Sequence, residues 1–285
     1  MIKNFKLIGA EFGFGAQLRD TALGPAAIKA ALEPKLQESY IGLSAAPEYG
    51  TPKVGKESFP AIVEFCHRLA DATYQAVQEG CFPITLGGDH SIAMGSWRGI
   101  IKALNADGKF GLIWIDAHMD SHTYENSVSK AYHGMPLAAL MGHGDEALKG
   151  NINPSYVVVV GARSYEPEEK LLLEELGVKV FYASEVHARG LNAVLAEAKS
   201  IASQANGGFG ASLDLDFFDP KFAPGVGSPE SGGFDPEEFL ACMEVLLDDK
   251  LKGFEIVELN PNRDVDFKTT QIASRVIECI TNNNF

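Results

Sequence analysis

The sequence predicts one three-layer α/β/α domain, residues 1–285, built around a central, mostly parallel β-sheet. Three observations favour this fold class. Short apolar, β-branched runs alternate with longer segments of helical periodicity along the whole chain. Several short runs have no polar face, which is typical of strands that helices cover on both sides. No internal repeat and no linker rich in Pro, Gly and Ser divides the chain.

In chain order, the first half is expected to form strand 5–10, helix 26–32, helix 60–79, strand 82–86, helix 91–104 and strand 111–115. Apolar residues recur at helical spacing in the helical segments, whereas apolar and β-branched residues fill the short ones. Pro25 and Pro60 stand near helix starts, where proline is favoured, and Gly80 closes the second helix.

The second half is expected to form strand 156–160, helix 166–176, strand 178–182, helix 191–205, strand 211–217, helix 237–247, strand 254–259 and helix 269–280. Gly177 closes one of these helices, and Asp235-Pro236 caps and starts another. Strands separated by helices of this length imply right-handed crossovers, and therefore a parallel sheet. The longest irregular stretches are 44–59, 121–132 and 219–234.

Composition restricts the partners and the compartment. The formal net charge of -14 disfavours nucleic acid and anionic membranes as partners. It is compatible with a cationic substrate, although solubility alone explains many acidic proteins. The cysteines are scattered without C-x-x-C pairing, no signal peptide is visible, and no apolar stretch is long enough to cross a membrane. A cytoplasmic protein with free thiols is therefore expected.

Three segments place acidic residues or histidines just beyond apolar runs. The candidate metal ligands in them are His90, Asp116, His118, Asp120, Asp214 and Asp216. Residues two apart on an extended segment point the same way, so each set is expected to face the crevice above the sheet. One Asp-x-Asp pair alone is usually a solvated loop or a helix cap, but three such motifs at strand ends favour a metal centre.

The chemistry of these ligands favours two cations. Buried carboxylates in one place repel one another unless cations lie between them. A set rich in oxygen, with imidazole in the minority and no thiolate, suits manganese better than zinc. Two neighbouring ions can activate a water molecule and polarise the group that it attacks, so the sequence predicts hydrolysis.

Six motifs in this order resemble those of the ureohydrolase family, which includes arginases, agmatinases and related guanidino hydrolases. They are 87–91, 116–120, 133–136, 212–220, 227–233 and 258–261. The resemblance implies an arginase-like fold, two Mn²⁺ ions per subunit, cleavage of a guanidino group, and assembly into trimers or hexamers. It gives one ion His90, Asp116, Asp120 and Asp214, and the other ion Asp116, His118, Asp214 and Asp216.

The same resemblance assigns catalytic roles outside the metal ligands. Glu258 is expected to hold the guanidinium group through paired, charge-assisted hydrogen bonds, and His133 to transfer a proton to the departing amine. Asp89 is expected to orient a metal ligand. Without the resemblance, a glutamate at a strand end and a histidine in a loop would both be read as surface residues.

The substrate expected from the resemblance is L-arginine, which would give ornithine and urea. The spacing between His118 and His133 is similar to that of arginases, and Ser129 stands where arginases bind the substrate α-carboxylate. Glu166 is expected at the α-amino group, where aspartate is usual. The remaining expected substrate contacts are His122, where asparagine is usual, and Ser228. Glu230 also departs from the family pattern, because an apolar residue is usual there.

Other readings stay open. These departures are compatible with an agmatinase or another guanidino or formimidoyl hydrolase. A metal-binding protein without catalysis is a further alternative, although every expected role is filled. A nucleotide-binding domain is disfavoured, because no P-loop is present and no G-x-G-x-x-G motif follows the first strand.

Overall fold

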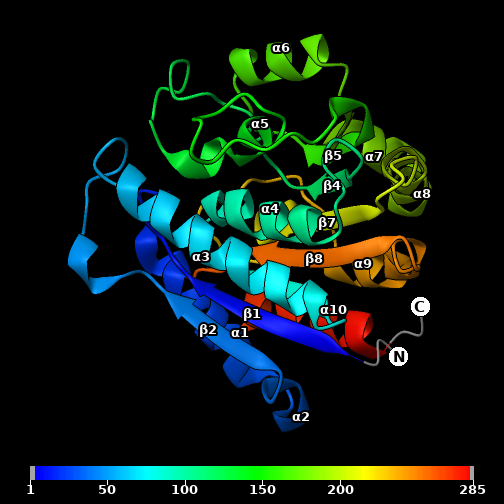
Figure 1. Cartoon of the computed structure of the whole chain (residues 1–285). Coiled ribbons are helices and arrows are strands. Elements are labelled where there is room, and N and C mark those ends of the chain that lie inside the picture. The colour runs from blue at the N-terminus through cyan, green and yellow to red at the C-terminus, as the bar shows by residue number, and fades with distance from the viewer. Residues whose placement is uncertain (1–3, 283–285) are drawn as a thin grey trace.

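The computed structural model describes residues 4–282, and their strands form one sheet (Figure 1). Eight strands are hydrogen-bonded in the order β2-β1-β3-β8-β7-β4-β5-β6, and every neighbouring pair is parallel. The strands are β1 (Phe5–Glu11), β2 (Tyr40–Ser44), β3 (Phe82–Gly87), β4 (Gly111–Ile115), β5 (Val157–Ala162), β6 (Lys179–Tyr182), β7 (Phe209–Asp214) and β8 (Leu251–Val257).

Helices cover both faces of this sheet and complete three layers (Figure 1). One face packs against α3 (Phe59–Gln78), α4 (Ala93–Ala103) and α5 (Pro136–Leu140). The other face packs against α1 (Gly24–Ala31), α7 (Ala183–Arg189), α8 (Leu191–Ala202), α9 (Pro236–Cys242) and α10 (Lys268–Asn282). The short α2 (Pro34–Gln37) and the peripheral α6 (Pro167–Glu175) complete the set. The predicted α/β/α class with a parallel sheet is therefore confirmed.

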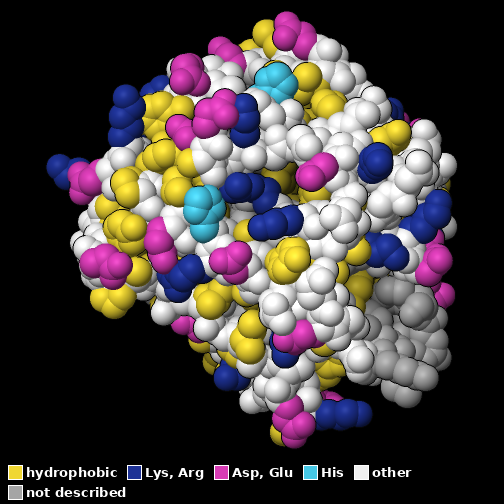
Figure 2. Space-filling model, viewed as in Figure 1, with side chains coloured by type: hydrophobic (Ala, Val, Ile, Leu, Met, Phe, Trp, Pro, Cys, Tyr) yellow, Lys and Arg dark blue, Asp and Glu magenta, His cyan; other side chains and the backbone are white. Residues whose placement is uncertain are grey.

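The two cores follow from strand alternation. In β4, Ile113 and Ile115 belong to the core beneath α8, whereas Leu112 and Trp114 belong to the core beneath α4. All of these side chains are fully buried, as expected for a strand with no polar face. On the α3–α4 side, acidic and basic side chains are interspersed over the surface (Figure 2).

The strands that carry the candidate ligands are neighbours at the centre of the sheet. Strands β3, β8, β7 and β4 lie side by side, and their carboxyl ends share one edge because the sheet is parallel. The segments that follow these strands must therefore meet. None of the helices in residues 4–282 is long and apolar enough to cross a membrane.

Some expected elements were wrong or missed. The expected strands 211–217 and 254–259 end early, at Asp214 and Val257. A 3₁₀ turn follows the first, and Glu258 leaves the second with a φ of 66°. Strand β2 was missed because its residues are half-buried or exposed at the edge of the sheet, so they lack an apolar run. The helices expected at 191–205 and 237–247 end at Ala202 and Cys242.

Candidate metal centre

The six expected metal ligands meet at the central edge of the sheet. His90 follows β3, Asp116, His118 and Asp120 follow β4, and Asp214 and Asp216 lie at and just beyond the end of β7. Five of the six are buried, and the His118 side chain is 24% exposed. The group therefore has a closed side around His90 and an open side around His118.

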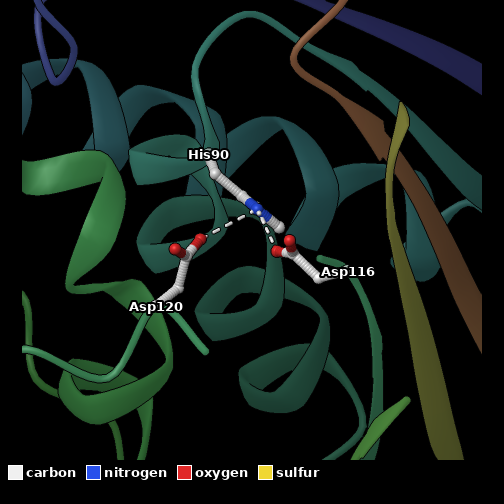
Figure 3. Close-up of side chains that lie close together, drawn as sticks. All are labelled: His90, Asp116 and Asp120. Carbon is white, nitrogen blue, oxygen red and sulfur yellow. Dashed lines mark ion pairs between the residues drawn. The ribbon is translucent and has the colours of Figure 1, made fainter. Parts of the chain in front are cut away.

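Three carboxylates surround His90. Its Nδ1 atom lies 3.0 Å from an oxygen of Asp120 and 3.3 Å from oxygens of Asp116 and Asp214. Figure 3 shows the edge of the ring pointing between Asp116 and Asp120. Despite these short separations, Nδ1 makes no hydrogen bond within residues 4–282. The oxygens converge on the nitrogen from several sides, which is the arrangement of ligands around a cation.

The second half of the site centres on His118. Its Nδ1 atom lies 3.1 Å from Asp216 and 3.4 Å from Asp116. Asp116 turns Oδ2 toward His90 and Oδ1 toward His118, so one carboxylate reaches both histidines. This geometry fits an aspartate that bridges two ions.

Local turns, rather than extended strand geometry, bring these side chains together. The Oδ1 atom of Asp116 accepts a hydrogen bond from the backbone N–H of His118 at 2.7 Å. Asp214 does the same for the N–H of Asp216 at 2.8 Å. Each aspartate thus curls the chain after its strand, as short acidic side chains commonly do. The expectation that these residues alternate along an extended segment was wrong, although they meet at the expected edge.

A buried relay sets the protonation of His90. Ser212 donates to Glu255 at 2.8 Å, which uses its only proton, so the contact of 2.9 Å between Ser212 and His90 Nε2 must have the ring as donor. Trp97 also donates to Glu255, at 3.1 Å, and Ser96 does so as well. With one proton on Nε2, His90 turns Nδ1 toward the three carboxylates, where this atom holds a second proton in the metal-free protein and would offer a lone pair to a bound cation.

Trp114 supports the same half of the site. Its ring stacks on His90, with centroids 4.0 Å apart and planes at 7°. Its Nε1–H donates to Asp116 Oδ2 at 2.9 Å. These contacts fix the orientations of one imidazole and one carboxylate before any ligand binds, so the site is pre-organised.

The electrostatic environment of the cluster favours binding of a cation. Burial and the charges of Asp216 and Asp116 raise the pKa of Asp214 well above its ordinary value. Burial likewise raises the pKa of Asp216, to about 6. Burial opposes a charged His90, but its three carboxylate neighbours outweigh this and raise the pKa of His90 well above its ordinary value. The negative potential that stabilises a proton on His90 would also stabilise a metal cation. Such a cation would reduce the repulsion among the carboxylates.

The residues fit divalent cations. The Nδ1 atom of a buried imidazole faces three carboxylates, and the possible ligand atoms are mainly oxygens. Hard cations such as Mn²⁺ prefer such sets. Without a metal ion, the cluster needs protons on its histidines and on Asp214 to offset the buried negative charge, and bound cations would replace these protons.

The expected catalytic pair lies directly beside this centre. Glu258 Oε1 lies 3.2 Å from His133 Nδ1 and accepts the backbone N–H of His90 at 2.9 Å. Burial disfavours the imidazolium of His133, but the hydrogen bond and the charge of Glu258 outweigh it and raise the pKa of His133 to about 9. Gly227 leaves room for Glu258, because a Cβ atom there would lie 2.8 Å from Oε2.

Asp89 is fully buried and acts on the backbone. Its carboxylate accepts the N–H of Ser91 at 3.0 Å and that of Gly15 at 2.8 Å, and the carbonyl of Gly15 in turn accepts the N–H of His133 at 3.2 Å. Asp89 therefore holds the turn that carries His90 and the loop that carries His133, and its contacts reach both through the main chain.

The expected substrate contacts line the mouth of the same cavity, which has a volume of about 160 Å³. His122 donates from Nε2 to Glu166 at 2.9 Å and from Nδ1 to the amide oxygen of Asn126 at 3.0 Å. Ser129 is exposed, and Ser228 lines the same cavity without a side-chain hydrogen bond in the described part of the chain. Ten of the twelve expected site residues thus line one cavity, and the other two, His90 and Asp116, contact residues of its lining.

Sequence reasoning missed several supporting residues. Ser212 and Glu255, which support His90, were overlooked. Glu169, which forms an ion pair with His122 in the cavity lining, was overlooked as well. Glu169 is buried, accepts the N–H of Ser121 and of Glu166, and has its pKa raised to about 7 by burial first and by Glu166 second. One signal was present: Glu255 is a charged residue within a predicted buried strand, where a carboxylate needs partners.

Comparison with known proteins agrees with this geometry. Residues 3–282 match the model of the "Arginase family". The arginase of Bacillus caldovelox is 35% identical over 95% of this chain and 96% of that protein. The crystal structure of the Bacillus subtilis arginase covers 99% of this chain and 100% of that chain, with 34% identity and a TM-score of 0.87. An Entamoeba histolytica arginase solved with L-ornithine is 25% identical, with a TM-score of 0.90 and coverage of 99% and 100%. The chain therefore belongs to the arginase family of hydrolases.

Proposed function

We propose that this protein is an arginase with two manganese ions, which hydrolyses L-arginine to ornithine and urea. The metal ligands proposed are His90, Asp116, Asp120 and Asp214 for one ion, and Asp116, His118, Asp214 and Asp216 for the other. When bound, two such ions lower the pKa of a water molecule and polarise the group under attack. We also infer that residues 1–285 act as one domain, since all eight strands share one sheet.

One observation carries the metal assignment: the Nδ1 atom of His90, oriented by Ser212 and Glu255, faces three carboxylate oxygens within 3.3 Å. Such a group of atoms needs a positive charge at its centre, and in the metal-free protein a proton on Nδ1 supplies it, as the raised pKa of His90 indicates. A metal ion would take the place of that proton and accept a lone pair from each of these atoms.

Two residues would act on the substrate itself. Glu258 would hold the guanidinium group, because its carboxylate faces the cavity beside the metal ligands. His133 would give a proton to the departing amine. Its raised pKa, about 9, keeps the ring protonated at neutral pH in the metal-free protein, and its contact with Glu258 supports a position beside a guanidinium group held by that carboxylate.

The substrate assignment rests on the relatives and on the mouth. The relatives that cover almost the whole chain are named arginases, and one neighbour was solved with L-ornithine, the product expected from L-arginine. Ser129 and His122 offer donors for a carboxylate at the mouth, and Glu166 offers an acceptor for an amine.

A second candidate substrate is a guanidino compound whose tail ends in an amine, such as agmatine. The observation that favours it is the contact of 2.9 Å between His122 and Glu166, because it pairs a histidine that would otherwise be available to a substrate carboxylate. Glu166 stays 58% exposed and can still accept from an amine.

The test combines substrates and metals. Urea release would be measured on L-arginine, agmatine and guanidinobutyrate, after chelation and addition of single metals. We expect Mn²⁺ to restore activity and L-arginine to be the preferred substrate. Restoration by Zn²⁺ or Ni²⁺ alone would contradict the choice of metal, and faster turnover of agmatine would favour the second candidate.

The cellular setting and the assembly also stay proposals. Cys66 and Cys242 are buried free thiols, which suits a reducing cytoplasm. We expect a trimer or hexamer, and light scattering coupled to size-exclusion chromatography would measure the mass of the assembly.

A further inference from the structure

His118 has a second nitrogen that the metal centre does not use. Its Nδ1 atom faces Asp116 and Asp216, whereas its Nε2 atom faces the loop after β7. An imidazole that gives a lone pair at Nδ1 carries its proton on Nε2, and ligand histidines nearly always donate that proton to a carboxylate, a carbonyl or water. Within residues 4–282, the carboxylate nearest this atom belongs to Glu230, with 3.9 Å between Nε2 and Oε1.

Glu230 is held in place rather than free in solvent. The hydroxyl of Ser164 donates to the same Oε1 atom at 3.1 Å. Arg163 donates to the backbone carbonyls of Glu230, at 3.0 Å, and of Ser231, at 3.2 Å. The guanidinium of Arg163 also donates to the carbonyl of Asp216 at 2.6 Å, so a metal ligand and the Glu230 loop share one anchor.

The geometry suits a supporting contact. A separation of 3.9 Å is within the range of an ion pair and longer than a hydrogen bond. The Glu230 side chain is 40% exposed, so a small rotation can shorten the contact without disturbing the core. Glu230 stands where an apolar residue is usual in the resembling family, and its contacts with Ser164 and His118 give the carboxylate a structural role.

We propose that Glu230 is a positioning residue for the second metal ion: its carboxylate accepts a hydrogen bond from the Nε2–H group of His118, fixes the ring with Nδ1 toward the ion, and strengthens that nitrogen as a ligand. Ser164 supports it by holding its carboxylate. This inference rests on the proposed two-ion centre, and it does not depend on which guanidino compound is the substrate.

The experiment measures Mn²⁺ binding to the full chain without substrate. Free Mn²⁺ would be followed by electron paramagnetic resonance during titration of the metal-free protein with MnCl₂. Glu230→Ala is expected to weaken one of the two binding steps about 10-fold and to leave the other within about twofold. Glu230→Gln, which keeps an acceptor oxygen but loses the charge, is expected to fall between wild type and Glu230→Ala.

A matched control separates positioning from net charge. Glu175 is an exposed carboxylate at the end of α6 with no ion pair or hydrogen bond of its side chain in the described chain. Glu175→Gln removes the same charge as Glu230→Gln and is expected to leave both binding steps unchanged. Thermal unfolding of the metal-free variants is expected to match wild type, because Glu230 and Glu175 lie outside the core.

Ser164 gives a second, independent test. Ser164→Ala is expected to weaken the same binding step by about threefold, less than the full effect of losing a supporting group. Because Ser164 acts through Glu230, the double variant with Glu230→Ala is expected to bind no more weakly than Glu230→Ala alone.

Three results would overturn the inference. They are two unaltered binding steps in Glu230→Ala, equal losses in Glu230→Ala and Glu175→Gln, and fully additive losses in the double variant. If wild type binds two Mn²⁺ ions with this dependence on Glu230 but releases no urea from L-arginine, the proposed substrate fails and the positioning role stands.

Discussion

The two halves of the candidate metal centre differ in where each histidine finds a partner for its second ring nitrogen. Both histidines face carboxylates through Nδ1 and need a partner for Nε2. The side chain of His90 is 1% exposed, and its relay through Ser212 and Glu255 lies on neighbouring strands in the core. The side chain of His118 is 24% exposed, and its nearest carboxylate, Glu230, lies on a loop. Metal binding and folding should therefore be coupled around His90 and nearly independent around His118.

Asp116 belongs to both halves, so its loss is expected to have the largest effect. Asp116→Ala removes the carboxylate that reaches both histidines and should reduce urea release by more than about 10³-fold. Mn²⁺ should also no longer raise the unfolding temperature, because ligand binding stabilises only a protein that binds it. Asp214→Ala is expected to behave alike. Turnover at the wild-type rate in either variant would refute the shared-ligand assignment.

Substitution of Glu255 tests the buried half of the site, around His90. Glu255→Leu leaves the donors on Trp97 and Ser212 buried without their acceptor, and Ser96 keeps only its contact of 3.5 Å with the carbonyl of Ala93. The free energy of unfolding of the metal-free protein should fall by about 3 kcal/mol or more, and Mn²⁺ should bind more weakly. Denaturant unfolding and Mn²⁺ titration would measure both. Two results would contradict the difference between the two halves. In one, Glu255→Leu weakens metal binding without lowering stability; in the other, Glu230→Ala lowers stability as much as Glu255→Leu does.

His133 is expected to make the free energy of unfolding of the metal-free protein depend on pH. Its folded pKa of about 9 exceeds the ordinary value of 6.5, so the folded protein binds this proton more tightly than the unfolded chain. The resulting stability is fully present below about pH 6.5 and is lost as the pH rises through about 9. It amounts to about 1 to 3 kcal/mol. His133→Gln should lack this part of the slope in urea unfolding measured between pH 6 and pH 10; an unchanged slope would remove His133 as its source.

The smallest effect is expected from substitution of His122, at the mouth of the cavity. His122→Asn releases Glu166 from its partner and restores the residue that is usual in arginases. The ratio of kcat/KM for L-arginine to that for agmatine should rise by about threefold to tenfold, or about 1 kcal/mol. Steady-state urea release on both substrates would show it. An unaltered ratio would mean that the contact between His122 and Glu166 does not control specificity.

The order of most elements, and the gathering of the six candidate ligands at one edge of the sheet, could be predicted from sequence, because both depend on local patterns. Apolar runs with no polar face identify buried strands, and acidic residues after them mark the edge where sites form. Strand ends were less predictable, since an aspartate at a strand end can either continue the strand or turn the chain, as Asp214 does.

The amino-acid sequence by itself determined that the chain alternates strands and helices and that six candidate ligand residues stand at or just beyond strand ends. Only the tertiary structure decided that β8 lies between β3 and β7, which brings Glu255 to Ser212 and Glu258 to the backbone of His90. It also decided that the loop with Glu230 folds back on His118. The physical reason is that the lateral order of strands and the course of loops depend on how whole layers bury their apolar faces, which no local pattern records.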